Sequence, residues 1–420
     1  MTITEWTAQG ELGLTTVLIA RERRAGETRV AATPETVKRL VGLGCSVHLE
    51  QGAGQAAGYA DGAYGDAGAT LFDGTAAEAS DRWAGADVLL AVQAPQAGSG
   101  AGLAQLRPGA LVMGLLDPFA NRDLIGTLLE RKLSAMALEL LPRISRAQAM
   151  DALSSQANIA GYKAALQAAA ALDRFFPMLM TAAGTVQPAK VVVLGAGVAG
   201  LQAVATARRL GALVKVSDVR PAAREQVESL GARFIEPPVM EQSPGEAGGY
   251  AKEAGAVFLE AQRQLLAPHL AEADVVITTA LVPGRPAPLL ITRDMLGLLR
   301  PGAVVMDLAV AQGGNCAASQ PDQETVVEGV RVIGAGNLPA SVPFHASSLY
   351  ARNLLALLQH LLAAGAKGAG ERLEAESPQA SGPSLGIDPA DPILEGCLIT
   401  HAGSCRRPDL LDAVPTPARP

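Results

Sequence analysis

The chain has 420 residues, of which 49% are hydrophobic and 18% charged, enough for roughly two or three domains with large cores. Its net charge of −7 argues against a nucleic-acid-binding surface and fits an ordinary soluble enzyme. The four cysteines have no metal-ligand spacing, so we expect free thiols and a reducing compartment. Neither a signal peptide nor about 18 consecutive apolar residues are visible, so we expect no membrane span in this chain.

The N-terminal third of the chain alternates between strand and helix patterns. Thr15–Ala20 is an apolar strand, and the next helix begins at Pro34, with Thr33 as its N-cap, and ends at Gly44. This alternation predicts a parallel sheet with helices on both faces, and hence one doubly wound domain. The other predicted strands are Ser46–Glu50, Asp87–Val92, Ala110–Leu116 and Ala135–Leu140, with helices at Asp61–Ala67 and Asn121–Lys132.

The stretch from Lys190 to Asp218 predicts dinucleotide binding. Lys190–Leu194 lacks polar alternation, as a strand buried on both faces does, and Gly195-Ala196-Gly197-Val198-Ala199-Gly200 leads from it into a helix. In such a motif the first glycine allows the turn, the second lets the backbone approach a pyrophosphate, and the third allows close packing. Asp218 can bind a ribose 2′-hydroxyl and would repel a 2′-phosphate, so NAD is favoured over NADP. Arg220 is a mild argument against that preference.

Residues 189–342 continue the same alternation. The predicted fold class is therefore α/β, with two doubly wound Rossmann-like parallel-sheet domains joined by long helices. We assign 1–142 and 343–406 to the first domain, because a helix at Pro343–Ala364 should pack back on it, and 143–188 to the connection. Composition predicts a flexible linker at 365–384 and a mobile loop at Pro237–Gly249. The remaining predicted helices are Ala147–Phe175, Gly255–Leu265 and Thr292–Leu299, and the strands are Arg233–Glu236, Asp274–Thr278, Val304–Asp307, Val330–Ile333 and Ile393–Thr400.

The segment from Arg143 to Asn158 is unusually polar for a connection between domains. Gln148, Asp151 and Ser154 are spaced three apart, so one helix face can present an amide, a carboxylate and a hydroxyl to a carboxamide. The alternative is a solvated helix start, with Ser145 as its cap and Arg146 exposed. The position between two sheet domains favours a ligand, because clefts between domains are where such sites form.

These motifs resemble the NAD(H)-binding alpha subunit of proton-translocating NAD(P) transhydrogenase, which shares its fold with alanine dehydrogenase. The similarity covers most of Thr15–His360 and includes several long motifs. They are Glu27-Thr-Arg29-Val-Ala, Glu50-Gln-Gly-Ala-Gly54, Arg143–Tyr162, Gly249-Tyr-Ala-Lys252, Thr278–Pro288 and Gly313-Gly-Asn-Cys316.

The resemblance implies direct hydride transfer from NADH bound here to NADP⁺ held by a partner domain. Such a transfer needs no acid or base, and the protein must position the rings and exclude water. Gln148 is expected to steer the partner nucleotide, and Tyr250 to lie in a loop that closes on NADH. Arg143, Gln148, Asp151 and Ser154, with Ile144 and Ser145, match the nicotinamide end; Gly195, Ala196, Gly197, Val198 and Gly200 the pyrophosphate; Asp218, Val219 and Arg220 the adenosine ribose; and Gly249, Gln262 and Leu281 further contacts.

An alanine dehydrogenase is the alternative from the same superfamily. Amino-acid oxidation needs a basic group and a cation for the carboxylate. Where that family has a lysine and a histidine this chain has Ala91 and Leu115, and the interval Arg82–Arg131 contains neither residue type. We therefore expect Arg29 to be structural, in a salt bridge of the first domain. An NAD-binding sensor without turnover is a third possibility.

The resemblance also predicts partners. A chain without membrane spans cannot itself move protons, so we expect the multi-subunit form, in which separate membrane chains and an NADP-binding subunit dock on this one. We expect a homodimer, cytoplasmic and peripherally attached to the inner membrane through those partners.

Overall fold

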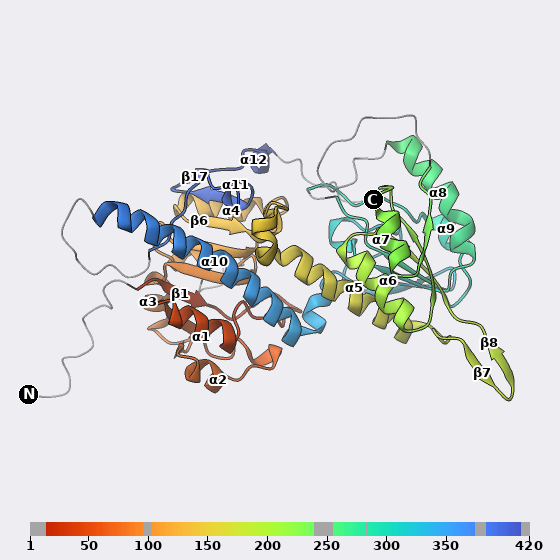
Figure 1. Ribbon diagram of the computed structural model, residues 1–420, viewed down its shortest axis with the longest axis horizontal. Coiled ribbons are helices and arrows are strands. Elements are labelled where there is room, and N and C mark those ends of the chain that lie inside the picture. The colour runs from red at the N-terminus through yellow and green to blue at the C-terminus, as the bar shows by residue number, and fades with distance from the viewer. Residues whose placement is uncertain (1–13, 96–101, 239–254, 283, 374–383, 413–420) are drawn as a thin grey trace, which may run out of the picture. The chain divides into compact units, whose positions relative to one another are not determined.

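The computed structural model describes residues 14–95, 102–238, 255–282, 284–373 and 384–412. The chain folds into two compact units. Unit 1 contains Met1–Gln156 and Val342–Pro415, and unit 2 contains Ala157–Ser341 (Figure 1). Both are α/β units built on mainly parallel sheets, as predicted.

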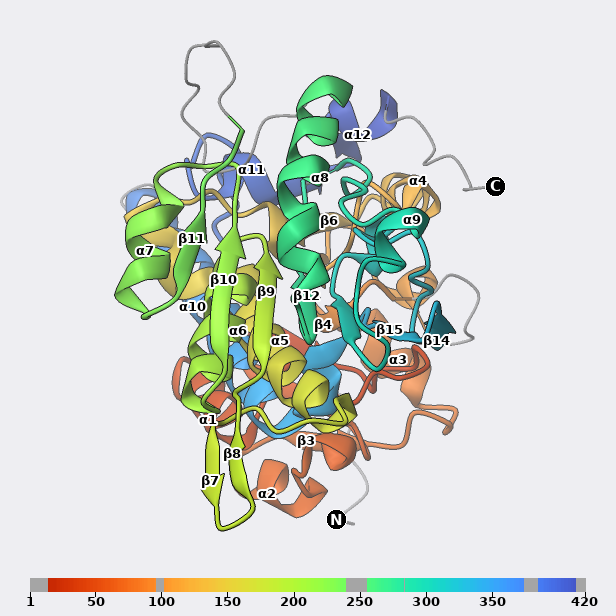
Figure 2. The same ribbon diagram turned by 90° about the vertical axis from the view of Figure 1, so that its right-hand side faces the viewer.

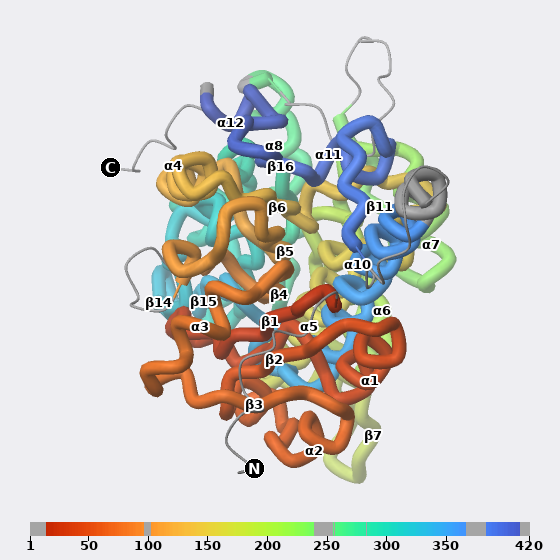
Figure 3. Tube along the Cα trace, turned by 90° about the vertical axis from the view of Figure 1, so that its left-hand side faces the viewer, coloured from red at the N-terminus to blue at the C-terminus, as the bar shows by residue number. Residues whose placement is uncertain are grey.

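Unit 1 is built on an eight-stranded sheet with the order β17-β16-β6-β5-β4-β1-β2-β3 (Figure 3). All neighbouring strands from β6 to β3 are parallel, and β16 and β17 pair antiparallel at one edge. The strands are β1 Thr16–Ile19, β2 Ser46–Glu50, β3 Thr70–Phe72, β4 Val88–Gln93, β5 Leu111–Leu115, β6 Ser134–Ala137, β16 Leu398–His401 and β17 Ser404–Cys405.

Helices cover both faces of this sheet. Alternate residues of one strand enter different cores: Val17 and Ile19 join one hydrophobic cluster and Leu18 joins the other. This two-sided burial explains why the strands read as continuous apolar runs. The helices of unit 1 are α1 Pro34–Gly42, α2 Asp61–Asp66, α3 Ala79–Ala84, α4 Arg122–Glu130, α10 Pro343–Leu373, α11 Leu394–Cys397 and α12 Asp409–Asp412. Thr33 caps α1 and Pro34 opens it, which confirms the predicted start.

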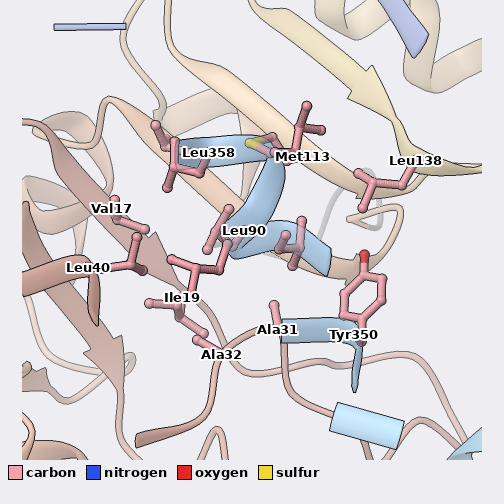
Figure 4. Close-up of a cluster of buried hydrophobic side chains, with 14 of the residues drawn as sticks. Val17, Ile19, Ala31, Ala32, Leu40, Leu90, Met113, Leu138, Tyr350 and Leu358 are labelled. Atoms are coloured by element: carbon pink, nitrogen blue, oxygen red, sulfur yellow. The ribbon is translucent and has the colours of Figure 1, made fainter. Parts of the chain in front are cut away.

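Helix α10 packs on the sheet of unit 1, as predicted from its sequence. Tyr350 and Leu358 of α10 lie among Ile19, Leu90 and Met113 of the strands (Figure 4). The buried Tyr350 hydroxyl donates to the Ala91 carbonyl oxygen at 2.8 Å, so the helix is also hydrogen-bonded to β4. The helix runs on to Leu373, so the prediction that the linker begins at residue 365 was wrong at its start. The alanines and lysine of this stretch favour helix, and its glycines alone do not end one.

Unit 2 is built on a seven-stranded sheet with the order β11-β10-β9-β12-β13-β15-β14, several strands of which Figure 2 shows side by side. Val191 and Val193 of β9 pack in the same core as α5 and α6, and Val192 and Leu194 pack in the opposite core with α8. The strands are β9 Lys190–Leu194, β10 Leu213–Ser217, β11 Arg233–Ile235, β12 Val275–Thr278, β13 Val304–Asp307, β14 Glu324–Val327 and β15 Val330–Gly334. The helices are α6 Val198–Arg209, α7 Ala223–Ser229, α8 Ala256–Ala271 and α9 Arg293–Leu296.

Three further predictions need correction. The expected helix 147–175 is instead a 3₁₀ helix, Ser145–Met150, and an α-helix, α5 Ala152–Ala171, with a break at Asp151. The expected strand 393–400 is the short helix α11 followed by β16. The hairpin of β7 Leu179–Thr181 and β8 Gly184–Val186 was not predicted. Most of the loop 237–249 lies outside the described residues. Within the described ranges, none of the helices combines the length and apolarity that crossing a bilayer requires.

Candidate dinucleotide site

The glycine turn of unit 2 joins β9 to α6 at the carboxyl end of the strand. Gly195 has φ +104° and donates its N–H to the Ser217 carbonyl oxygen at 2.8 Å. A β-carbon at Gly195 would lie 2.7 Å from Thr279 Oγ1, and one at Gly200 would collide with the Gly195 carbonyl oxygen. A β-carbon at Gly197 would meet nothing within 4 Å. Gly195 and Gly200 are therefore needed for packing, whereas Gly197 leaves space in front of the α6 N-terminus, where an anion is favoured.

Asp218 follows β10 and is almost fully buried beside this turn. Its Oδ2 accepts the Ala196 N–H at 2.7 Å, and its Oδ1 accepts the Arg220 N–H at 2.9 Å. The Arg220 guanidinium donates to both carboxylate oxygens, at 2.9 Å each. Burial by itself would raise the pKa of Asp218, but the hydrogen bonds from Arg220 and Ala196 hold it below its usual range. Asp218 is therefore a carboxylate, and Arg220 binds that carboxylate. Val219, between them, is half-buried.

The other predicted contacts of unit 2 are placed differently from one another. Leu281 follows β12 and is 41% exposed, so its side chain can be reached from solvent. Gln262 lies in the middle of α8 and is only 4% exposed. Gly249 and Tyr250 lie outside the described residues.

Sequence reasoning gave no role to Thr279, which joins the end of β12 to the glycine turn. Its hydroxyl donates to the Gly195 carbonyl oxygen at 3.1 Å, and its N–H donates to the Leu194 carbonyl oxygen at 2.8 Å. The motif Thr278–Pro288 was noticed for its resemblance, but a contact between residues more than eighty positions apart has no local signature.

The predicted nicotinamide-end residues all belong to unit 1. Gln148 is exposed on the 3₁₀ helix, and Arg143, Ile144 and Ser145 lie at or before its start. The prediction that Gln148, Asp151 and Ser154 share one continuous helix face was wrong, because Asp151 interrupts the helix. Asp151 Oδ1 accepts the Ser154 N–H at 2.8 Å and its Oδ2 accepts the Ser154 hydroxyl at 2.6 Å. An aspartate can continue a helix or cap the next one, and here it caps.

Asn353 of α10 supports the segment that carries Gln148. Its Nδ2 donates to the Ala149 carbonyl oxygen at 2.8 Å, and its Oδ1 accepts the Ser155 hydroxyl at 2.7 Å. One buried carboxamide therefore binds both sides of the break at Asp151.

Arg29 is in a buried salt bridge, as predicted. Its Nη2 lies 2.7 Å from Glu27 Oε2, and both side chains are almost fully buried. Its Nη1 donates to Gln156 Oε1 at 2.8 Å. Ala91 is buried and Leu115 half-buried, so neither position supplies an acid or a base. Arg29 is held by protein groups and is not poised for a substrate carboxylate.

Comparisons with known proteins agree with this geometry. The family model for the alanine dehydrogenase/PNT N-terminal domain matches residues 18–160, and that for the C-terminal domain matches 164–379. The first of the chains that form NAD(P) transhydrogenase subunit alpha in Rhodospirillum rubrum is 51% identical over 345 residues, 81% of this chain and 89% of that protein. The crystal structure of a transhydrogenase from Sinorhizobium meliloti has a TM-score of 0.78 at 43% identity, covering 93% of this chain and 99% of that one.

An alanine dehydrogenase is more distant. The enzyme from Halomonas elongata is 31% identical over 333 residues, 78% of this chain and 82% of that protein. Together with the matches to both domain models, these similarities show that the chain belongs to the alanine dehydrogenase/PNT family.

Proposed function

We propose that the chain is the NAD(H)-binding alpha subunit of a proton-translocating, Re/Si-specific NAD(P)⁺ transhydrogenase. It transfers hydride directly between NADH and NADP⁺ that a partner subunit holds, and membrane partners couple the transfer to proton movement. The relatives named transhydrogenase subunit alpha, at 40–51% identity, support this choice.

The observation that carries the proposal is the contrast between the two units. Unit 2 has a glycine turn with open space at Gly197 and a buried carboxylate at Asp218, which fit a dinucleotide. Unit 1 has no acid or base at positions 91 and 115, and its Arg29 is bound by Glu27. A nucleotide site without acid–base groups suits hydride transfer and disfavours the alternative, an alanine dehydrogenase.

The residues of this chain act by binding and positioning. The α6 N-terminus favours the pyrophosphate, and Asp218 accepts a ribose hydroxyl while repelling a 2′-phosphate. Because Arg220 binds Asp218, its charge is committed to that carboxylate, which keeps the preference for NAD. Bound NADH supplies the hydride. Gln148, with Arg143, Asp151 and Ser154, orients the nicotinamide end.

The partners follow from the same proposal. NADP⁺ is held by a second subunit, and membrane chains keep this one at the cytoplasmic face of the inner membrane. The β7–β8 hairpin supports a homodimer: Figure 2 shows it projecting from unit 2, and Met180 on it is 81% exposed. An isolated hairpin is only marginally stable in water, so a second copy is a suitable cover. Sedimentation of the purified chain tests this, and a monomer at micromolar concentration contradicts it.

The decisive experiment mixes the purified chain with NADH, an NADP⁺ analogue and a recombinant NADP-binding partner domain. Turnover only with the partner supports the proposal. Oxidation of alanine by the chain alone would indicate a dehydrogenase. Tight NADH binding without turnover in either case would indicate a sensor.

Replacing Gln148 by Asn tests the nicotinamide-end assignment. The shorter amide keeps its chemistry but withdraws by one methylene, so NADH binding should be largely retained and hydride transfer lost. The Gln148 side chain is exposed, so the variant should fold as the wild type does. An unchanged transfer rate would remove Gln148 from the mechanism.

A further inference from the structure

A buried polar cluster lies at the carboxyl ends of β12 and β13. Asp307, the last residue of β13, is fully buried, and its carboxylate accepts four hydrogen bonds. Oδ1 accepts the Thr278 hydroxyl and the Ala309 N–H, at 2.9 Å each, and Oδ2 accepts the N–H groups of Asn315 and Cys316, at 2.9 and 3.1 Å. These bonds fix the backbone of residue 315 relative to both strands.

Asn315 extends this cluster to the loop that follows β12. Its carboxamide is fully buried: Oδ1 accepts the Ala280 N–H at 3.1 Å, and Nδ2 donates to the carbonyl oxygens of Ala280 and Pro288, at 2.9 and 2.8 Å. Both amide hydrogens are used, and both backbone groups of Ala280 are paired with one side chain. A residue at this position must therefore supply one acceptor and two donors.

Ala280 lies between the two residues of this loop that face the dinucleotide site. Thr279 precedes it and binds the Gly195 carbonyl oxygen, and Leu281 follows it with an exposed side chain. A shift of the Ala280 backbone would move both neighbours. It would also disturb the turn itself, because Gly195 is packed tightly against Thr279 and the Ala280 nitrogen.

We propose that Asn315, held in place by Asp307, is a positioning residue for the dinucleotide site. It fixes Ala280 so that Thr279 stays on the glycine turn and Leu281 keeps its place beside the nucleotide. This inference rests on the proposed binding of NADH at that turn.

The test is titration of NADH into the full-length Asn315→Asp variant between pH 5.5 and 8. The introduced carboxylate keeps the acceptor but loses both donors, so the Kd should rise roughly tenfold at pH 8. Protonation at low pH restores one donor, so the Kd should fall again toward pH 5.5 while that of the wild type stays flat. A merely structural role would change thermal stability without this pH-dependent affinity.

Asp274→Asn is the matched control. Asp274 is a buried carboxylate before β12, at the opposite end of that strand, and accepts the Lys190 N–H at 2.9 Å and Arg174 Nη1 at 3.0 Å. This variant also loses a buried polar contact of the same sheet, but its Kd for NADH should stay within about twofold of the wild type. An equal loss of affinity in the control would overturn the inference, because general destabilisation would explain both.

The remaining outcomes separate this inference from the function on which it rests. A wild-type chain that does not bind NADH overturns both. A wild type that binds, with an Asn315→Asp variant of the same affinity at every pH, overturns only the role of Asn315. If Asn315→Asp does not fold, Thr278→Val removes one donor to Asp307 and tests the same chain of contacts. Its Kd should rise about threefold, and an unchanged Kd would contradict the proposal.

Discussion

The glycines of the turn carry different physical loads at the scale of single residues, and alanine substitutions separate them. A methyl group at Gly200 would collide with the Gly195 carbonyl oxygen, whereas one at Gly197 would meet no protein atom within 4 Å. Gly197→Ala should therefore fold with a melting temperature near that of the wild type but lose NADH affinity by about tenfold or more, because the methyl group occupies the space of the pyrophosphate.

Gly200→Ala is the counterpart and should lose stability first, by roughly 1–3 kcal/mol, because helix and turn must move apart. Thermal unfolding and NADH titration of both variants check the pair. Normal NADH binding by Gly197→Ala would mean that the pyrophosphate lies elsewhere.

The buried carboxyl groups of unit 1 make its stability depend on pH. Burial raises the pKa of Glu22 from 4.5 to about 7, offset to some extent by the Val92 N–H that Glu22 accepts at 2.6 Å. Burial likewise raises the pKa of Glu139 to about 7. A raised folded-state pKa means that the folded state binds more protons, so this stability is fully present below about pH 4.5 and is lost as the pH rises through about 7.

The variants Glu22→Gln and Glu139→Gln should each flatten that pH dependence, since the amide cannot ionise. Denaturant unfolding of each variant and of the wild type at pH 5, 6, 7 and 8 measures the difference. Parallel curves for the wild type and the double variant would rule these two groups out as its source.

At the scale of elements, α10 supports the 3₁₀ helix through one side chain. Asn353 binds the Ala149 carbonyl oxygen and the Ser155 hydroxyl, so Asn353→Ala leaves buried polar groups unpaired. Unit 1 should lose about 1–3 kcal/mol of stability, and amide exchange should rise in residues 145–150. Arg352→Ala removes a surface ion pair with Glu35 from the same helix and should cost less than about 1 kcal/mol. Equal effects of the two variants would contradict the supporting role of Asn353.

Regular elements with two-sided burial could be predicted from the sequence, and edges could not. The valines of β9 and β13 and the Thr33–Pro34 start of α1 have local causes, which the structure confirms. The edge strand β14 is half exposed, and the β7–β8 hairpin is mostly exposed, so neither has a clear apolar pattern. The break at Asp151 depends on the hydrogen bonds of its own side chain, which helix spacing does not reveal.

At the scale of the whole molecule, the chain has two doubly wound units, but only unit 2 has a glycine turn with a carboxylate beside it among the described residues. The turn and Asp218 were predictable because strand, glycines, helix and acid follow one another in sequence. The contacts of Thr279 and Asn315 were not, because they join residues brought together only by the sheet. The family resemblance supplied the nicotinamide-end residues, whose role no local pattern determines.

The central claim is that hydride passes directly from NADH on this chain to NADP⁺ on a partner. The most direct measurement uses NADH deuterated at the transferred position, the partner's NADP-binding domain and ordinary water, followed by mass analysis of the product. We expect one deuterium in the reduced NADP, no transfer without the partner, and no dependence on alanine. A product that carries hydrogen from water, or reduction of NAD⁺ driven by alanine on this chain alone, would contradict the account.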